Sequence, residues 1–382
     1  MSTVCDLAAL TARAEEALVP AFAAFDRIAL ENTRKVLAAF QRHRVSDSHF
    51  APSTGYGYND PGRETLDAVF ADLMGTEDAL VRTSFASGTH AIGCALRAAA
   101  PQGGYLSLTG EPYDTLQGLL PYTAQTGAAR QTEQPAALFI QRSRGYTSRK
   151  ALSVAEVNAL IAEARTWCNA PVVVDNCYCE FVETEEPCAA DLIAGSLIKN
   201  PGGGLAPCGG YVAGRRNLVE KAAVALNGVG RDCGANPDGS RLLFQGLFLA
   251  PHTVAQALKT AAFASYILRE LGYAVSPRPE EARSDIIQSV AFGSPEPLLR
   301  FCRGIQAGSP VDSFAAPEPW DMPGYGDPVV MAAGTFIQGA SIELSCDAPI
   351  REPYTAYLQG GLTYEAGKLG ILTALETLQC GF

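Results

Sequence analysis

The hydrophobic positions between residues 79 and 213 alternate between short apolar runs and longer amphipathic stretches. The run Pro171–Asp175 is β-branched and short, so it predicts a buried strand. Between the runs, residues 84–99 read as a turn and a helix, and a capping box at Ser153 and Glu156 opens a helix to about Trp167. This alternation predicts parallel βαβ units. The apolar runs are ALVR at 79–82, Tyr105–Leu108, Ala137–Ile140, Pro171–Asp175, Leu192–Ile198 and Gly210–Ala213.

The segment before this region is helical in pattern but interrupted. Residues 6–44 predict two helices that are broken near Pro20, since proline removes a backbone donor inside a helix. An irregular stretch with several glycines and prolines follows. Asp60 is then placed to cap a helix that begins at Pro61, and Gly75 is placed to end it.

The pattern changes again near residue 250. A long helix is predicted from Pro251 to about Leu271, and beyond it strands and helices alternate in a looser α+β manner. The strand candidates there are Asp285–Phe292, Val329–Ala333 and Ser341–Leu344. We therefore expect an α/β fold in three parts. They are an N-terminal helical segment at 1–48, a large domain with a mostly parallel sheet at 49–250, and a smaller α+β C-terminal domain at 251–382.

Charge and composition argue against several kinds of partner. The 382 residues carry a formal net charge of −11 and have a pI near 5.0. A nucleic-acid partner is not expected, because phosphate backbones bind basic surfaces. A polybasic membrane patch is not expected either. Charged residues make up only 18% of the chain, which indicates a large buried fraction that a subunit interface could enlarge.

The N-terminus and the cysteines indicate a cytoplasmic protein. The first residues lack the basic start and apolar block of a signal peptide, and no stretch of 18 uncharged apolar residues appears. The 11 cysteines include no CxxC pair, and the chain has four histidines, so no metal site is expected. We expect reduced thiols and no membrane association.

Three features fall where predicted strands end, which is the edge of a parallel sheet that binds ligands. The first is Ser87-Gly88-Thr89. Ser87 has the character of a helix cap, and Gly88 permits close approach of the backbone. The free N–H groups of a helix start bind phosphate. Taken alone, the same residues describe an ordinary capped helix.

The other two features are a carboxylate and a lysine. Asp175 ends the run VVVD, where a carboxylate needs a partner such as a pyridinium nitrogen, although it could instead cap the following turn. Lys199 follows an apolar run, and burial would lower the pKa of its amine and free it as a nucleophile. The glycines after it could equally form a surface loop. In this order, the helix start, Asp175 and Lys199 are typical of a pyridoxal-phosphate enzyme.

Longer motifs make the resemblance specific. They include GYGYNDPGRETL, SGTHAI, QRSRGY, VVVDNCYCEFVE, AGSLIKNPGGGLAPCGGYVAGR, AAGTFIQGASIEL and QGGLTYE, spread from about residue 47 to 366. Through them the chain resembles the aluminium-resistance and methionine γ-lyase-like family, a branch of the cystathionine-lyase relatives. The resemblance implies the PLP-dependent transferase fold of type I and bound pyridoxal 5'-phosphate. It also implies a homodimer or homotetramer with shared active sites.

The resemblance assigns roles to individual residues. Lys199 matches the lysine that holds the cofactor as a Schiff base, and Asp175 matches the carboxylate that faces the pyridine nitrogen. The expected catalytic residues are Lys199 and Tyr113. The other matches are Ser87, Gly88, Thr89 and Ser196 at the phosphate, Tyr113 stacked on the cofactor ring, Tyr56 and Tyr58 reaching the neighbouring subunit's phosphate site, and Arg351 at the substrate carboxylate.

The sequence departs from the family's pattern in several places. The segment between Tyr113 and Phe139 is shorter than in relatives. Cys179 stands where glycine is usual, and Cys346 and Ala348 stand in SCDAP where SADGP is more common. These differences are either ordinary loop trimming or signs of a changed substrate pocket, and the sequence leaves both interpretations open.

The implied chemistry is γ-elimination from an L-amino acid. Lys199 would remove the Cα proton and then a Cβ proton, and the flank Pro201–Gly204 would give it room to move. His90 is expected inside the helix that starts at Ser87, which leaves Lys199 as the strong base candidate. The leaving group would be sulfide or halide.

Several activities stay open within this chemistry. One specialised branch removes chloride and leaves a terminal-alkyne amino acid, and the trimmed segment makes methionine the poorer expected substrate. The alternatives are a methionine γ-lyase-like or cystathionine-lyase-like C–S lyase and a γ-replacement transferase that uses the same residues. A non-catalytic protein is disfavoured, because Asp175 and Lys199 are both present.

Overall fold

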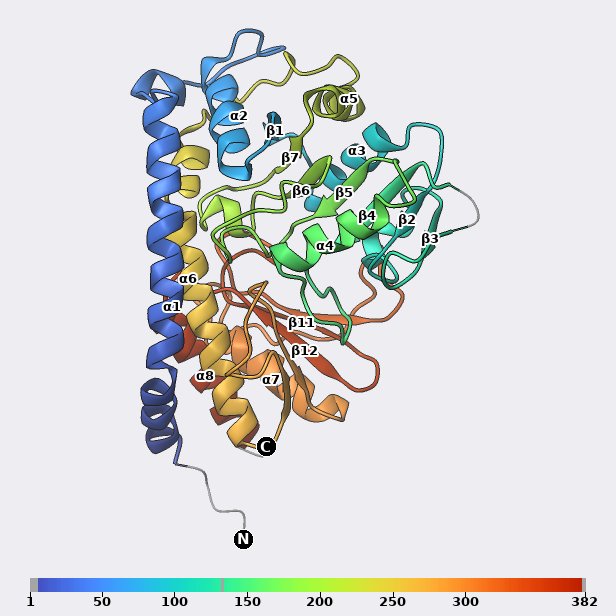
Figure 1. Cartoon of the computed structure of the whole chain (residues 1–382). Coiled ribbons are helices and arrows are strands. Elements are labelled where there is room, and N and C mark those ends of the chain that lie inside the picture. The colour runs from blue at the N-terminus through green and yellow to red at the C-terminus, as the bar shows by residue number, and fades with distance from the viewer. Residues whose placement is uncertain (1–5, 132–133, 380–382) are drawn as a thin grey trace.

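The computed structural model describes residues 6–131 and 134–379. The larger sheet consists of β1 (Asp78–Arg82), β2 (Tyr105–Ser107), β3 (Tyr122–Ala124), β4 (Ala137–Gln141), β5 (Val172–Asp175), β6 (Leu192–Ser196) and β7 (Gly210–Gly214). Its order is β1-β7-β6-β5-β4-β2-β3 (Figure 1). The strands from β6 to β3 are parallel neighbours, and β7 runs antiparallel to both β1 and β6. The mostly parallel sheet predicted from the sequence is confirmed.

Alternate residues of these strands belong to two hydrophobic cores. In β5, Val172 and Val174 pack on one face of the sheet and Val173 packs on the other. Because both faces are buried, the strands read as continuous apolar runs in the sequence. One face is covered by α1 (Leu7–Arg42), α2 (Pro61–Met74), α4 (Val154–Ala164) and the first half of α6 (Arg241–Glu270), and the other by α3 (Gly88–Ala99) and α5 (Arg216–Asn227).

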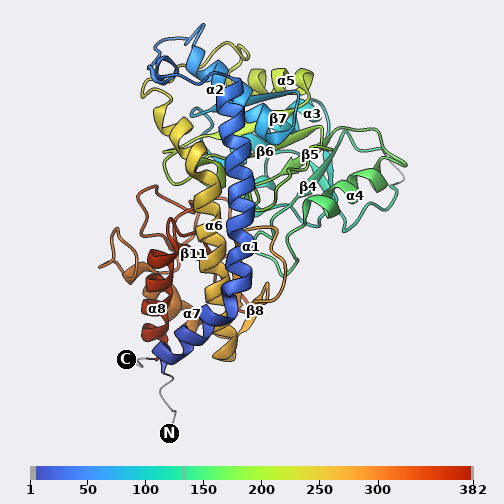
Figure 2. The same cartoon turned by 60° about the vertical axis from the view of Figure 1, so that its left-hand side comes forward.

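The N-terminal helix differs from its prediction. α1 continues through Pro20 as one α-helix, whereas the sequence predicts two. The proline is accommodated by a bend, and the dark blue part of the helix leans away from the rest in Figure 2. Both sides of Pro20 are held by packing, since Leu18 lies in the core of the C-terminal part and Val36 in the core of the large sheet.

The predicted start of the long helix at Pro251 is also wrong. α6 begins at Arg241, and Pro251 lies inside it. The turn before Pro251 is held in helical form because Phe244 and Leu247 are buried against the large sheet. Figures 1 and 2 show α6 lying beside α1 along most of the molecule. The boundary expected near residue 250 therefore falls within a helix that both parts share.

The C-terminal part contains a second, antiparallel sheet in the order β10-β11-β12-β9-β8, covered by α7 (Pro295–Ala307) and α8 (Tyr364–Gln379). Its strands are β8 (Ala274–Ser276), β9 (Gln288–Ala291), β10 (Val329–Ala332), β11 (Ser345–Pro349) and β12 (Thr355–Gln359). The predicted strand Ser341–Leu344 is wrong. Those residues form a turn in which the Glu343 carboxylate accepts the N–H groups of Phe336 and Ile337 at 2.9 and 2.8 Å.

Two of the predicted helix starts are confirmed by their caps. Asp60 accepts the N–H of Arg63 at 2.9 Å at the start of α2, which ends at Gly75 in the left-handed conformation. Ser153 and Glu156 form the reciprocal capping box of α4. Short 3₁₀ turns occur at η1 (Asp47–Phe50), η2 (Asp114–Leu116) and η3 (Asn200–Gly202). Among the helices of the described ranges, none combines the length and apolarity needed to cross a membrane.

Candidate active site

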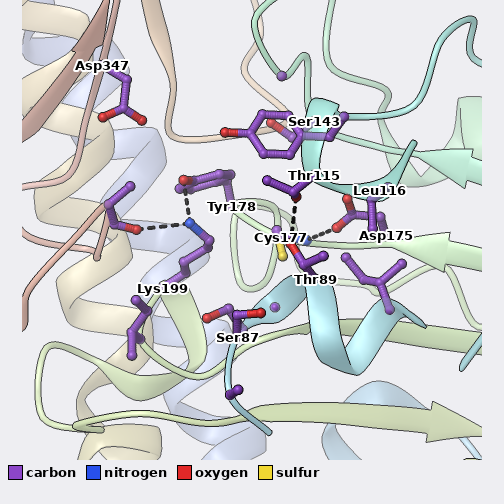
Figure 3. Close-up of a pocket in the computed structure, with 18 of the residues that line it drawn as sticks. Ser87, Thr89, Thr115, Leu116, Ser143, Asp175, Cys177, Tyr178, Lys199 and Asp347 are labelled. Carbon is purple, nitrogen blue, oxygen red and sulfur yellow. Dashed lines mark hydrogen bonds between the residues drawn. The ribbon is translucent and has the colours of Figure 1, made fainter. Parts of the chain in front are cut away.

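A cavity of about 350 Å³ lies at the carboxyl ends of the central strands. Gln141, Asp175 and Ser196, which end β4, β5 and β6, line one side. Met331 of β10 and Asp347 of β11 also line the cavity, so both sheets contribute to it. Figure 3 shows Asp347 across the cavity from Asp175. The structure brings together many of the residues predicted from the sequence. Those that line the cavity are Ser87, Gly88, Thr89, Tyr113, Asp175, Ser196 and Lys199.

One end of the cavity has the form of an anion site. The hydroxyl of Ser87 caps α3, and the hydroxyl of Thr89 lies 2.7 Å from that of Thr115. A Cβ added to Gly88 would stand 3.0 Å from the Cβ of Ser196, so glycine lets the helix start approach the end of β6. The N–H groups of this helix start are available to a phosphate group.

Asp175 lies on the wall of the cavity, at the end of β5. It is buried, and its Oδ1 accepts the N–H of Cys177 at 3.0 Å. Burial raises the pKa of this carboxyl, and the hydrogen bond from Cys177 acts in the opposite direction. A protonated ring nitrogen placed against Asp175 would form a charge-assisted hydrogen bond and offset the cost of burying the carboxylate.

Lys199 reaches the middle of the cavity from the segment after β6 (Figure 3). Its Nζ donates to the carbonyl of Ala340 at 2.9 Å and to the hydroxyl of Tyr178, and it lies 3.8 Å from the centroid of the Tyr178 ring. Burial lowers the pKa of the amine, while Cys177 and Asp347 act to raise it. The lowered pKa makes the neutral, nucleophilic form of the amine more accessible.

The segment after Lys199 is not the loose flank that the sequence indicated. Residues 200–202 form the buried turn η3, which packs on α6. Gly203 has a φ of 54°, and a Cβ there would stand 2.2 Å from the carbonyl oxygen of Gly246. The glycine is therefore needed for close packing, and freedom of the amine comes from the lysine side chain itself.

These features fit pyridoxal 5'-phosphate. The contact between Gly88 and Ser196 forms a cradle that a larger residue would fill, next to free N–H groups suited to the phosphate. Asp175 is a buried carboxylate suited to the ring nitrogen, and Lys199 carries the amine that would attach the cofactor. All three groups face one cavity, as the family resemblance implies.

Tyr113 lines the same cavity just before η2. Its N–H donates to the side chain of Gln141 at 2.8 Å, and its hydroxyl lies 2.7 Å from that of Tyr325. Its ring meets the rings of Tyr146 and Tyr325 edge-on, with centroids 5.4 and 5.9 Å away. Burial raises the pKa of Tyr113 well above its usual range, so its hydroxyl stays protonated and can donate a hydrogen bond to a substrate atom.

Three predicted residues lie outside the cavity. Arg351 donates to Asp327 at 2.9 Å and to the carbonyl of Tyr146 at 3.0 Å, beside a separate surface pocket. Its role at the substrate carboxylate stays a prediction. Tyr56 and Tyr58 are 64% and 56% exposed and stack on each other with centroids 5.4 Å apart. Their contact with a neighbouring subunit stays a prediction as well.

Sequence reasoning missed Asp347, which lines the cavity from β11. Its neighbours Cys346 and Ala348 pack in the core of the C-terminal part, because successive strand residues point to opposite faces. The two unusual residues of SCDAP therefore do not reshape the cavity. The spacing of Cys346, Asp347 and Ala348 fits a strand, but the sequence around them does not indicate which face of that strand meets the cavity. The hydroxyls of Tyr178 and Tyr325 were also missed.

Two other residues that the sequence analysis named lie away from the cavity. Cys179 is fully buried, and its thiol lies 3.5 Å from the carbonyl of Cys177. His90 lies inside α3, as predicted, and its Nδ1 accepts the N–H of Ala86 at 3.2 Å. Neither residue supplies a base to the cavity in the described part of the chain.

Comparisons with known proteins agree with this geometry. The family model described as methionine gamma-lyase matches residues 7–134 and 123–379. A solved structure from Listeria monocytogenes, named as a candidate cystathionine beta-lyase involved in aluminum resistance, is 44% identical to this chain. The match covers 97% of this chain and 99% of that one, with a TM-score of 0.92. A carbon-sulfur lyase involved in aluminum resistance from Clostridium novyi is 45% identical over 96% of this chain and 94% of that one, with a TM-score of 0.87.

A curated relative matches over a similar length. The uncharacterized protein YnbB of Bacillus subtilis is 44% identical over 388 aligned positions, which cover 92% of both chains. The fold of type I and the cofactor expected from the sequence are thus confirmed by the family. The chain belongs to the methionine gamma-lyase family of pyridoxal-phosphate-dependent lyases.

Proposed function

We propose that the protein removes a γ substituent from an L-amino acid, with a sulfur group as the preferred leaving group. The observation that carries the proposal is one cavity holding a base, Lys199, and a half-buried pair of hydroxyls, Tyr113 and Tyr325. Pyridoxal phosphate, when bound, supplies the sink for the electron pair left at Cα. The protons must then be moved by side chains of the protein.

Lys199 is the base in this proposal for both the Cα and the Cβ proton. Burial lowers the pKa of its amine, which makes the neutral, basic form more accessible than in an ordinary lysine. Its backbone is fixed by the packed turn η3, so the flexible side chain carries the amine from Cα to Cβ. Asp175, which lines the cavity, would hold the ring nitrogen of the cofactor in its protonated form and so keep the electron sink effective.

The hydroxyl pair favours sulfur over halide. A thiolate leaves more readily when a proton is delivered to it, whereas a halide leaves without one. In this proposal Tyr113 delivers that proton. Burial makes its hydroxyl a weaker acid, and a hydrogen bond from the hydroxyl of Tyr325, 2.7 Å away, would stabilise the tyrosinate left behind. Thr115 and Leu116 of the shortened segment between Tyr113 and Phe139 line the cavity. This is the observation that favours halide removal, and it is less direct than the hydroxyl pair that favours sulfur.

The proposal can be tested on the protein loaded with its cofactor. The substrates are methionine, longer γ-thioethers of homocysteine, a γ-chlorinated amino acid and a chlorinated allylglycine. Release of keto acid together with thiol or chloride measures elimination from the saturated substrates. Release of chloride together with a terminal-alkyne amino acid measures elimination from the chlorinated allylglycine. We expect keto acid and thiol from at least one thioether.

A second arm separates elimination from replacement. If an added thiol or amine suppresses keto acid and appears in a new thioether or amine product, the protein is a γ-replacement transferase. Turnover of the chlorinated substrates alone, without any thioether turnover, would contradict the preference for sulfur. Turnover of β-substituted substrates alone would contradict γ-elimination.

A further inference from the structure

A second carboxylate lines the cavity on the side opposite to the anion site (Figure 3). Asp347 is 3% exposed and lines the cavity from β11. In Figure 3 its carboxylate points toward Lys199 and Tyr178, from the side opposite to Ser87. A substrate attached near Lys199 would therefore extend between the cofactor and Asp347. The elimination chemistry proposed above gives this carboxylate no task.

The two oxygens of Asp347 differ in their surroundings. Oδ2 accepts a hydrogen bond from the hydroxyl of Tyr146 at 2.9 Å. Oδ1 is buried and has no hydrogen-bond partner among the described residues. Leaving a buried carboxylate oxygen unpaired is costly, so such a group is usually completed by a ligand or neutralised by a proton. Burial indeed raises the pKa of Asp347, while Tyr146 and Lys199 oppose that rise.

The charges around the cavity leave Asp347 uncompensated once the cofactor is bound. Within the described ranges, Lys199 is the only cationic side chain that lines the cavity. Its amine would attach the cofactor and, once a substrate is bound, would serve as the base at Cα and Cβ, so it is not committed to Asp347. The phosphate of the cofactor would add further negative charge. Three guanidinium groups lie nearby. Arg351 donates to Asp327 and to the carbonyl of Tyr146, Arg144 donates to Ser276 and Ser289, and Arg149 donates to the carbonyl of Ser143. Among the described residues, none of the three is hydrogen-bonded to Asp347.

We infer that Asp347 binds an ammonium group at the end of the substrate's leaving arm. The preferred substrate is then a γ-thioether amino acid whose sulfur substituent ends in an amine, a class that carries one more positive charge than methionine. An ammonium would complete Oδ1 with a charge-assisted hydrogen bond. The rings of Tyr113 and Tyr325 line the same space and can also attract a cation. An arm ending in a carboxylate would be repelled. This inference rests on the proposed γ-elimination.

The test uses two isosteric thioethers, S-(2-aminoethyl)-L-homocysteine and S-propyl-L-homocysteine, with the cofactor-loaded protein. They differ in an ammonium against a methyl group at the end of the arm. We expect kcat/KM for the aminoethyl compound to be about 10- to 100-fold higher, the range of a hydrogen bond to a charged group. The ratio of the two values should fall toward one in Asp347→Asn. It should persist in Asp321→Asn, which makes the same charge change at an exposed position of the C-terminal part.

Binding of amino acids that have no leaving group separates this inference from the proposed function. L-Ornithine and L-norleucine form another isosteric pair, and their affinities can be measured by calorimetry. If neither thioether is cleaved but ornithine binds more tightly in an Asp347-dependent way, γ-elimination fails and ammonium recognition stands. Equal affinities and equal kcat/KM values within each pair would overturn the inference, even if Asp347→Asn does not fold. A preference that persists in Asp347→Asn would overturn it too.

Discussion

The amine of Lys199 lies against Tyr178, 3.8 Å from the centroid of its ring and hydrogen-bonded to its hydroxyl. Tyr178 has a φ of 70°, a left-handed backbone conformation that is uncommon for residues other than glycine. Such backbone strain clusters at functional sites, where it holds a side chain in place. The turn after β5 thus brings two groups to the cavity, the carboxylate of Asp175 and the hydroxyl of Tyr178.

Replacing Tyr178 by phenylalanine tests the role of that hydroxyl. The ring is kept, but an acceptor that favours the ammonium form of Lys199 is lost, so the pKa of the amine should fall further. The acid limb of the pH profile of kcat should then move to lower pH, with a loss in kcat of about tenfold or less. The other groups near the amine, Cys177, Asp347, Tyr325 and Asp175, are unchanged. An acid limb that does not move would indicate that Tyr178 only packs against the lysine.

Lys199→Ala should abolish covalent attachment of the cofactor. Borohydride reduction and peptide mapping should label Lys199 in the natural protein. Elimination by the variant should fall by at least about 10²- to 10⁴-fold, because the general base is lost. Lys150→Ala is the control, since that lysine is 78% exposed and lies outside the cavity. Labelling of a different lysine in the natural protein would refute the assignment.

Tyr113→Phe should distinguish between the two kinds of leaving group. Loss of the hydroxyl removes the proton donor, so kcat for a γ-thioether should fall by about 10²-fold or more. The rate for a γ-chlorinated amino acid should change much less, because chloride leaves without a proton. Tyr325→Phe removes the partner hydroxyl but leaves that of Tyr113 in place, and it should cost less. Equal losses for thioether and chloride substrates would rule out Tyr113 as the acid for the leaving group.

Glu180 makes the stability of the protein depend on pH. Burial raises the pKa of this carboxyl from 4.5 to about 8, although Tyr211 donates to it at 2.7 Å. The folded state holds the proton more tightly than the unfolded state, so stability is full below pH 4.5 and declines as the pH rises through 8. A tenfold difference in proton affinity between the two states corresponds to about 1.4 kcal/mol, so the decline amounts to several kcal/mol.

Glu180→Gln should remove most of that dependence, because the amide oxygen still accepts the hydroxyl of Tyr211 without carrying a charge. Urea unfolding of the natural protein and the variant at pH 5 and pH 9 measures the difference. The natural protein should lose more stability between the two pH values than the variant. A parallel loss in both proteins would assign the pH dependence to other groups.

Tyr56 and Tyr58 are predicted to complete the site of a neighbouring subunit. Light scattering should then find a dimer or larger assembly. Substituting both tyrosines by serine should weaken cofactor retention, although neither residue lines the cavity of its own chain. Mixing this variant with Lys199→Ala should restore activity, because a hybrid assembly contains one intact site. A strictly monomeric and fully active protein would contradict shared sites.

The large-domain part of the site could be predicted because its residues are fixed locally. Ser87, Asp175 and Lys199 each lie at or shortly after the end of a strand of the large sheet, and the carboxyl ends of parallel strands meet at one edge. Asp347 could not be found in this way. The start of β11 depends on the turn held by Glu343, so its register could not be read from the apolar pattern around it.

The two prolines misled the prediction for a related reason. Local rules end or break a helix near Pro20 and Pro251, yet both lie inside long helices. The apolar residues on both sides of each proline are buried in tertiary contacts, whose contribution exceeds the local cost. No local pattern reports those contacts, because α1 and α6 are far apart in the sequence.

The shared helix α6 connects the two parts of the molecule as one continuous helix. Its first half is anchored in the large-sheet core through Phe244, and its second half in the other core through Ile267. A rotation of one part against the other would have to bend α6. Pro251 is a position where bending costs less, because proline has no N–H and the helix lacks one backbone hydrogen bond there. A change in the width of the cavity that leaves α6 straight would have to come from the irregular segments that carry Tyr325 and Gln338, since both residues line the cavity outside any helix or strand.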